Sequence, residues 1–208
     1  MLGPRPIPLP PTAPPPKLPV LSAAPVPPLW RLHHEIDPRT PRHHSTGRFR
    51  FDAPAGQFPV TYGSEDEYGC FGEVYGDRRS IPPADSARLL SCLSATSPLR
   101  LIELDDGELL KALHPQLDGR ISSDIHYAIT QAWSLALHEW YPQAHGIRYV
   151  ARHATPYLNH CLFLERCKGL LDVKTEGKLQ DLHDLVTRAC DAYALAPRLF
   201  EPRDPGGW

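Results

Sequence analysis

Proline is concentrated near the beginning of this chain, and its distribution limits where a folded domain can start. The 208 residues include 25 prolines, and many of them lie in residues 4–11, 14–16 and 25–28. Proline cannot donate a backbone hydrogen bond to a β-ladder and does not continue a helix. We therefore predict that residues 1–28 form a disordered, solvated leader, although their PxxP spacing also suits a ligand of domains that bind polyproline helices.

The composition predicts one soluble domain after this leader. The chain is 41% hydrophobic and 22% charged, with a formal net charge of -2. This balance gives no electrostatic reason to expect DNA, RNA or an anionic membrane as the main partner. The five cysteines include no CxxC pair, which indicates reduced thiols, and no segment has the pattern of a secretory signal or a membrane span. We expect a cytoplasmic protein.

The hydrophobic pattern predicts a single mixed α+β domain over residues 29–196, followed by a flexible tail over residues 197–208. Strands are expected where apolar residues alternate, and helices where they recur at helical spacing. The expected strands cover residues 29–32, 58–62, 99–104, 146–151 and 160–165, and the expected helices begin at Ser64 or cover residues 84–90, 105–114, 123–140 and 179–194. Because strands and helices do not alternate regularly, a repeated βαβ architecture is not indicated.

Several common metal and catalytic motifs are missing from the sequence. Adjacent histidines, at residues 33–34 and 43–44, would point to opposite faces of a strand, so we predict no metal site. His138 begins an HExxH pattern, but Pro142 stands where the second histidine is needed. There is no GxSxG elbow, P-loop or GxGxxG motif. Cys70 is interpreted as a buried thiol because no partner histidine can be assigned to it.

One stretch of the chain carries residue types that suit a nucleotide better than a packed core. Arg31 and Arg48 present planar guanidinium groups that match phosphate oxygens, and Tyr62 adds a phenol. Glu73 adds a carboxylate, which can stabilise a sugar that becomes positively charged. Each residue alone is more often found in a surface or packing role. Their occurrence together, in this order, predicts a nucleotide site.

This order of residues resembles the RES-domain family, which is named for Arg, Glu and Ser positions. The matching segments are Leu29-Trp30-Arg31-Leu32, Gly47-Arg48-Phe49, Val60-Thr61-Tyr62 and Phe71-Gly72-Glu73. The similarity continues through residues 100–104, 118–120, 127–132 and 146–149, and it covers about residues 29–170. The leader lies outside it.

The resemblance implies a fold related to ADP-ribosyltransferases and an enzyme that breaks the nicotinamide–ribose bond of NAD. NAD would be the substrate, with no separate cofactor. Glu73, Tyr62 and Arg31 would be catalytic, and Arg48, Arg31, Tyr62 and Arg152 would bind the substrate. Glu73 would stabilise the positive charge on the ribose, and Arg31 and Arg48 would hold the pyrophosphate or an incoming phosphate. Tyr62 would either stack on the nicotinamide or hydrogen-bond a ribose hydroxyl.

The resemblance also bears on partners. Several members of the family are toxins of toxin–antitoxin pairs that deplete NAD, so a small helix-turn-helix antitoxin is an implied partner. Inorganic phosphate, water and a protein side chain all stay open as the acceptor of the ADP-ribosyl group. The sequence also leaves open whether the chain forms a dimer.

The chain departs from the family pattern at one position. The family serine follows the Gly-Ile-Arg-Tyr strand, whereas this chain reads Tyr149-Val150-Ala151-Arg152. Alanine has no hydroxyl and cannot donate or accept a side-chain hydrogen bond. Thr155, Ser122 and Ser123 are the candidates to replace it in space. The alternative hypothesis is a weakened or inactive RES-like module that binds nucleotide or protein.

Overall fold

One mixed sheet of eight strands runs through the computed structural model, which describes residues 6–34, 47–153 and 156–200. Its order is β1-β5-β6-β7-β3-β2-β4-β8, and every pairing is antiparallel except that of β5 with β6. The strands are β1 (Ala23–Ala24), β2 (Leu29–His33), β3 (Val60–Ser64), β4 (Leu89–Ala95), β5 (Leu99–Glu103), β6 (Gly146–Val150), β7 (Leu158–Phe163) and β8 (Leu171–Lys178).

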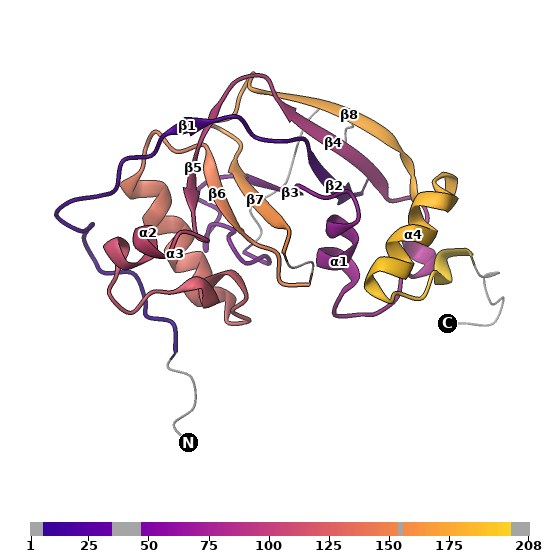
Figure 1. Cartoon of the computed structure of the whole chain (residues 1–208), viewed down its shortest axis with the longest axis horizontal. Helices are drawn as coiled ribbons and strands as arrows, with labels where there is room; N and C mark the ends of the chain where they lie inside the picture. Colours follow the sequence, from indigo (N-terminus) through magenta and orange to yellow (C-terminus); the bar gives the residue numbers. More distant parts are fainter. Residues whose placement is uncertain (1–5, 35–46, 154–155, 201–208) are drawn as a thin grey trace.

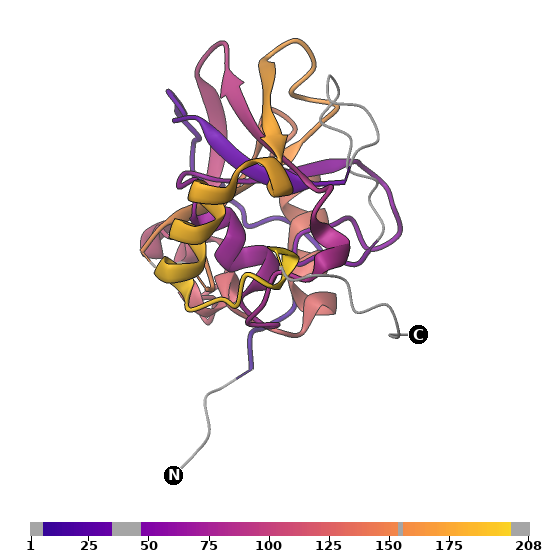
Figure 2. The ribbon, with the colours of Figure 1, turned by 90° about the vertical axis from the view of Figure 1, so that its right-hand side faces the viewer.

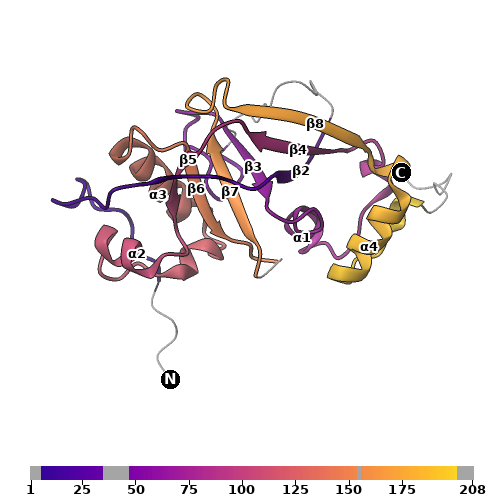
Figure 3. The ribbon, with the colours of Figure 1, turned by 45° about the horizontal axis from the view of Figure 1, so that its top comes forward.

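Four α-helices pack on one face of this sheet. They are α1 (Gly69–Tyr75), α2 (Gly107–Leu113), α3 (Tyr127–Trp140) and α4 (His183–Tyr193), with short 3-10 turns η1 (Pro83–Asp85), η2 (Gly119–Ser122), η3 (Leu179–Asp181) and η4 (Arg198–Phe200). Helices α2 and α3 lie at one end and α1 and α4 at the other, with β3 and β7 between them (Figures 1 and 3). Viewed from the α4 end, the helices lie below the strands (Figure 2).

Each pair of helices has its own hydrophobic core. Trp133 and Leu137, one turn apart on α3, are fully buried and pack with Ile147 of the sheet. At the other end, Phe71 of α1 packs with Leu32 in a second cluster. Both cores lie on the same face of the sheet, which we call the helix face. Residues that alternate with these along the strands lie on the opposite face, which we call the leader face.

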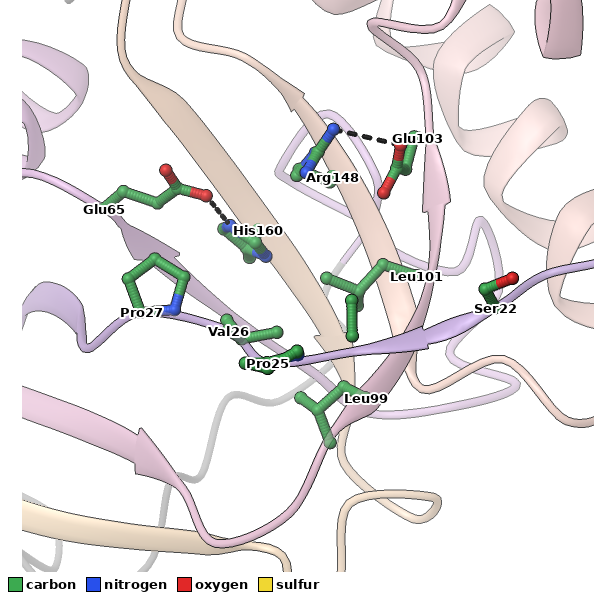
Figure 4. A pocket seen from close by; sticks show the side chains of 11 residues that line it. Ser22, Pro25, Val26, Pro27, Glu65, Leu99, Leu101, Glu103, Arg148 and His160 are labelled. Atoms are coloured by element: carbon green, nitrogen blue, oxygen red, sulfur yellow. Dashed lines mark hydrogen bonds and ion pairs between the residues drawn. The ribbon is translucent and has the colours of Figure 1, made fainter.

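The proline-rich segment packs against the domain, so the prediction of an unpacked leader is wrong for residues 6–28. Ile7 and Leu21 are buried in the helix-face core that contains Trp133, whose Nε1 donates to the Pro8 carbonyl at 2.7 Å. Residues 22–27 cross the leader face (Figure 4). Strand β1 pairs with β5 at the edge of the sheet (Figure 1). Proline lacks only the amide donor, so its carbonyl can still accept a hydrogen bond while the apolar residues between prolines are buried. The predicted tail likewise begins with an ordered turn, η4, in which Leu199 is buried.

Most expected elements are present, but two helix predictions are wrong. Ser64 does not begin a helix, because it is the buried last residue of β3, and α1 begins at Gly69. Residues 84–90 contain only the turn η1 and the start of β4. Strand β4 is buried on both faces, so its sequence does not alternate and gives no strand signal. Strand β8 was not expected either, since it is partly exposed throughout.

Candidate functional site

Tyr62 fixes the turn that carries Arg48. Its hydroxyl donates to Asp52 Oδ1 at 3.0 Å and accepts from the Phe51 amide at 3.0 Å. The other carboxylate oxygen of Asp52 accepts from the amides of Arg48 at 3.1 Å and Phe49 at 3.2 Å. Burial raises the pKa of Tyr62 well above its ordinary value, so this phenol keeps its proton at neutral pH. Asp52, which is fully buried, therefore holds the turn against β3.

Residues 48–51 of this turn form an exposed pair followed by a buried pair. Arg48 and Phe49 are exposed, whereas Arg50 and Phe51 are buried. The Phe49 ring lies 6.0 Å from the Tyr62 ring, between centroids. Arg48 therefore has a fixed backbone and a side chain free to reach toward a ligand above Tyr62.

Glu73 lies on α1 and points its carboxylate at the end of β6. Its Oε1 accepts from the backbone amide of His153 at 3.1 Å, and its side chain is half-buried. The approach of the helix to this loop is close, because a Cβ on Gly76 would lie 2.8 Å from the Cβ of His153. A larger residue at position 76 would push α1 away and carry Glu73 with it.

Tyr149 links Glu73 to Tyr62. The pKa of Tyr149 is raised well above its ordinary value, first by burial and next by the negative charge of Glu73. Tyr149 is also one of the groups that raise the pKa of Tyr62. In the sheet register Tyr149 pairs with Asn159, and Tyr62 pairs with Cys161 of the same strand, so both phenols lie on the helix face. Tyr149 therefore lies between the two in electrostatic terms, since it is acted on by Glu73 and itself acts on Tyr62.

Arg31 lies on the leader face and is not brought to Glu73. Its neighbours Trp30 and Leu32 pack with the α1–α4 cluster, so the side chain between them points the other way. Its guanidinium donates to the Thr61 hydroxyl, on the opposite side of β3 from Tyr62. Burial lowers the pKa of Arg31 to about 10. Arg31 supports β2 and β3 from behind the site.

Arg152 is at the edge of the helix face, paired with a carboxylate. Its Nη2 lies 3.4 Å from Asp77 Oδ1, and the same oxygen lies 3.2 Å from His153 Nε2. Because the Arg152 side chain is partly exposed, this ion pair is open to water and weak. A ligand phosphate can therefore compete for Arg152.

The position of the missing serine is closed and apolar. Ala151 is 1% exposed, and its amide donates to the Tyr157 carbonyl at 2.9 Å. On the same face, Asn159 is 3% exposed, and its Oδ1 has no hydrogen-bond partner in the described part of the chain. A buried acceptor without a donor is uncommon in native proteins. The helix face therefore carries a buried acceptor, Asn159 Oδ1, without a donor, and Ala151 has no hydroxyl that could supply one.

The sequence predictions missed Asp52 and gave Tyr149 and Asn159 no role. Asp52 follows Arg48 by four residues, but its partners are backbone amides and a tyrosine on another strand, which no local spacing reveals. Tyr149 lies inside a segment that resembles the family, but the sequence alone assigned it no function. Only the electrostatic effect of Glu73 on Tyr149 connects it with the site.

The leader face has a cavity of a different kind, shown in Figure 4. It lies between residues 22–27 and the sheet and has a volume of ≈ 30 Å³. His160 Nε2 lies 2.8 Å from Glu65 Oε1, and Arg148 Nη2 lies 3.0 Å from Glu103 Oε2. This volume holds about one or two water molecules and excludes a nucleotide.

Within residues 6–34, 47–153 and 156–200, no three His, Cys, Asp or Glu side chains are placed to hold a metal ion together. In the same part of the chain, no helix has the length and hydropathy needed to cross a bilayer.

Comparison with known proteins identifies the family. The model of the RES domain matches residues 28–185. A chain in the crystal structure of the M. tuberculosis MbcT–MbcA toxin–antitoxin complex is similar in fold, with a TM-score of 0.58 and 15% identity, over 76% of this chain and 87% of that chain. A comparison with curated proteins gives no match. Since the family model spans most of the sequence, this chain belongs to the RES-domain family.

Proposed function

We propose that this protein cleaves the nicotinamide–ribose bond of NAD and acts as the toxin of a toxin–antitoxin pair. The observation that carries the proposal is the Glu73 carboxylate, which accepts from the His153 amide and whose charge acts on the buried phenol of Tyr149. A fixed carboxylate in a partly buried site is what a developing positive charge on ribose requires.

The proposed reaction is a heterolytic cleavage of the glycosidic bond between ribose and nicotinamide. As the glycosidic bond breaks, its electron pair leaves with the nicotinamide nitrogen, and the ribose carbon becomes cationic. Glu73 stabilises that cation, while the Tyr62 ring forms one wall of the site, since its hydroxyl proton is already donated to Asp52. Phosphate or water then attacks the ribose carbon, giving ADP-ribose 1''-phosphate or ADP-ribose. Glu73 would stabilise the cationic ribose in the same way whether phosphate or water is the acceptor.

Arg48 and Arg152 are our candidates for contacts with the pyrophosphate. Arg48 is exposed on the fixed turn, and Arg152 is held only by a partly exposed ion pair. Because Arg31 lies on the leader face, we assign it a positioning role behind Tyr62, through Thr61. Its removal would loosen β3 and would not remove a phosphate contact.

The proposal is tested by incubating the purified chain with NAD, with and without inorganic phosphate, and measuring free nicotinamide. We expect release by the wild type and little by Glu73→Ala. Phosphate-dependent formation of ADP-ribose 1''-phosphate would identify a phosphorylase, and ADP-ribose a hydrolase. Release no greater than that of Glu73→Ala under both conditions would refute cleavage.

The closed alanine at position 151 supports a second candidate, a module that binds nucleotide without turning it over. Ala151 is 1% exposed and offers no polar group to a substrate. This candidate predicts that ADP-ribose binds in a calorimeter while no nicotinamide is released from NAD. It also predicts that Ala151→Ser gains activity, since a hydroxyl there lies on the same face as the unpaired Asn159 Oδ1.

An antitoxin partner is supported by the likeness to a chain from a toxin–antitoxin complex. The neighbouring reading frame provides the test. A small helix-turn-helix protein encoded there should co-purify with this chain and suppress nicotinamide release. A partner that binds without suppressing release would not be an antitoxin.

A further inference from the structure

Arg50 is a buried cation beside the proposed site. It lies two residues after Arg48 and is 7% exposed. Its guanidinium carbon lies 5.9 Å from the centroid of the Tyr127 ring and 6.0 Å from that of the Tyr149 ring. Its Nη1 donates to the carbonyl of Ser122, the last residue of η2. Arg50 thus joins the 47–52 turn to η2 and to the strand that carries Tyr149.

The charge of Arg50 has no counter-ion in the described structure. None of the ion pairs between described residues includes it. Its Nε is buried and has no acceptor in that part of the chain. A buried guanidinium is normally paired with a carboxylate or another anion, since desolvating an unpaired charge is costly. Arg50 is therefore a buried cation that no carboxylate of the described residues neutralises.

Ser122 supplies a second unsatisfied group next to the first. It is 2% exposed, and its Oγ is buried without a hydrogen-bond partner among the described residues. Its carbonyl already accepts from Arg50, so the hydroxyl and the guanidinium belong to one small cluster. A planar cation with a free N–H and an adjacent hydroxyl match the oxygens of a phosphate group.

We propose that Arg50 and Ser122 form a subsite for one phosphate group, either of the NAD pyrophosphate or of an incoming inorganic phosphate. The proposal rests on the proposed function, which places NAD on the helix face. Arg50 lies over the ring of Tyr149, on which the charge of Glu73 also acts, so a phosphate bound by Arg50 would be on the same side of the sheet as the proposed cleavage site. Ser122 provides the hydroxyl that β6 lacks two residues after Tyr149.

A purely structural role for Arg50 is the competing explanation. Stacking on two tyrosine rings and one bond to a carbonyl would tie three segments together without any ligand. That role explains the burial of Arg50. It does not explain why Nε and the neighbouring Ser122 Oγ are both left without partners.

The test uses the full chain, with Ser122→Ala and Arg50→Gln as test variants. Ser123→Ala is the matched control, because Ser123 is the exposed neighbour of Ser122. Thermal unfolding is followed with and without inorganic phosphate at constant ionic strength. Calorimetry gives the Kd of ADP-ribose and of nicotinamide riboside, which lacks the pyrophosphate.

We expect phosphate to stabilise the wild type and Ser123→Ala, and to stabilise Ser122→Ala by less than half as much. If the subsite holds the pyrophosphate, the Kd of ADP-ribose rises about tenfold in Ser122→Ala and more in Arg50→Gln, while that of nicotinamide riboside changes less than about twofold. If ADP-ribose binding is unchanged but the phosphate effect is lost, the subsite holds the incoming phosphate.

Unchanged responses to both phosphate and ADP-ribose in Ser122→Ala would overturn the subsite and leave a structural role for Arg50. No response to either probe in the wild type would overturn it as well. Nicotinamide release is measured separately, so the two proposals fail independently. Should Arg50→Gln fail to fold, Ser122→Ala decides the question, because removing one unpaired hydroxyl leaves the rings and the carbonyl in place.

Discussion

The charges that line the leader-face cavity and those around Tyr149 on the helix face are arranged differently. On the leader face, Arg148 lies 3.0 Å from both Glu103 and Asp105, and His160 is paired with Glu65. On the helix face, Glu73 and Arg50 take part in no ion pair among the described residues. Paired charges hold a structure together, whereas separate charges of both signs leave room for a ligand that carries both. NAD has such a distribution, with a cationic nicotinamide and an anionic pyrophosphate.

The largest expected effect on nicotinamide release comes from replacing one glutamate on each face with glutamine. Glu73→Gln keeps the shape of the side chain and removes the charge near the ribose, so we expect nicotinamide release to fall about 100- to 1000-fold. Glu103→Gln, on the leader face, should stay within about twofold of the wild type. Initial rates with saturating NAD provide the measurement. Equal losses in both variants would break the distinction between the faces.

The leader should contribute stability without contributing to the reaction. Leu21 belongs to the leader and is buried in the core that contains Trp133, so we expect Leu21→Ala to lower the free energy of unfolding by about 3 kcal/mol. Val20, its neighbour, is 92% exposed, and Val20→Ala is the control that should change little. Urea titration measures both. A Leu21→Ala protein as stable as the control would mean that the leader does not pack in solution.

Tyr62→Phe tests the bond that fixes the 47–52 turn. The variant leaves Asp52 Oδ1 and the Phe51 amide without the phenol hydroxyl, which should cost about 1 to 2 kcal/mol of stability. Arg48 would then be held less firmly, and we expect KM for NAD to rise more than kcat falls. Tyr157→Phe, at an exposed tyrosine, is the control. A change in kcat alone would place the Tyr62 hydroxyl in the chemical step.

The buried phenols predict a loss of stability at high pH. In the folded protein the pKa of Tyr149 is well above its ordinary value, so above about pH 10 the unfolded chain releases a proton that the folded chain keeps. Stability therefore falls as pH rises, by about 1.4 kcal/mol per pH unit for this group.

Urea titrations at several pH values measure the slope, which should be shallower by that amount in Tyr149→Phe. Burial lowers the pKa of Arg31 to about 10, which acts in the other direction, but Arg31 is present in both proteins and cancels in the comparison. Identical slopes in the two proteins would show that Tyr149 is accessible to water.

The sequence predicted the strands whose residues alternate and the motifs that lie within them. The expected strand over residues 29–32 corresponds to β2, and the expected strand over residues 58–62 overlaps β3, which carries Tyr62. The face on which Arg31 lies depends on which side of β2 the helices pack, and this side cannot be predicted from the sequence. Strand β4 gave no alternation because it is covered on both sides.

The contacts that complete the site join distant segments. Asp52 meets a tyrosine on another strand, and Arg50 meets Ser122, 72 residues away. No local spacing connects such residues. Prediction of the leader failed for a related reason, because proline content excludes helices and ladders but does not exclude packing of the apolar residues in between.

Amide hydrogen exchange with and without ADP-ribose tests the difference between the two faces most directly. We predict slower exchange on binding in residues 47–53 and 149–153, which surround the helix-face site, and no change in residues 22–27 and 99–102 on the leader face. Protection confined to residues 22–27 and 99–102 would contradict the account, because it would place the nucleotide at the leader-face cavity, where the charges are already paired.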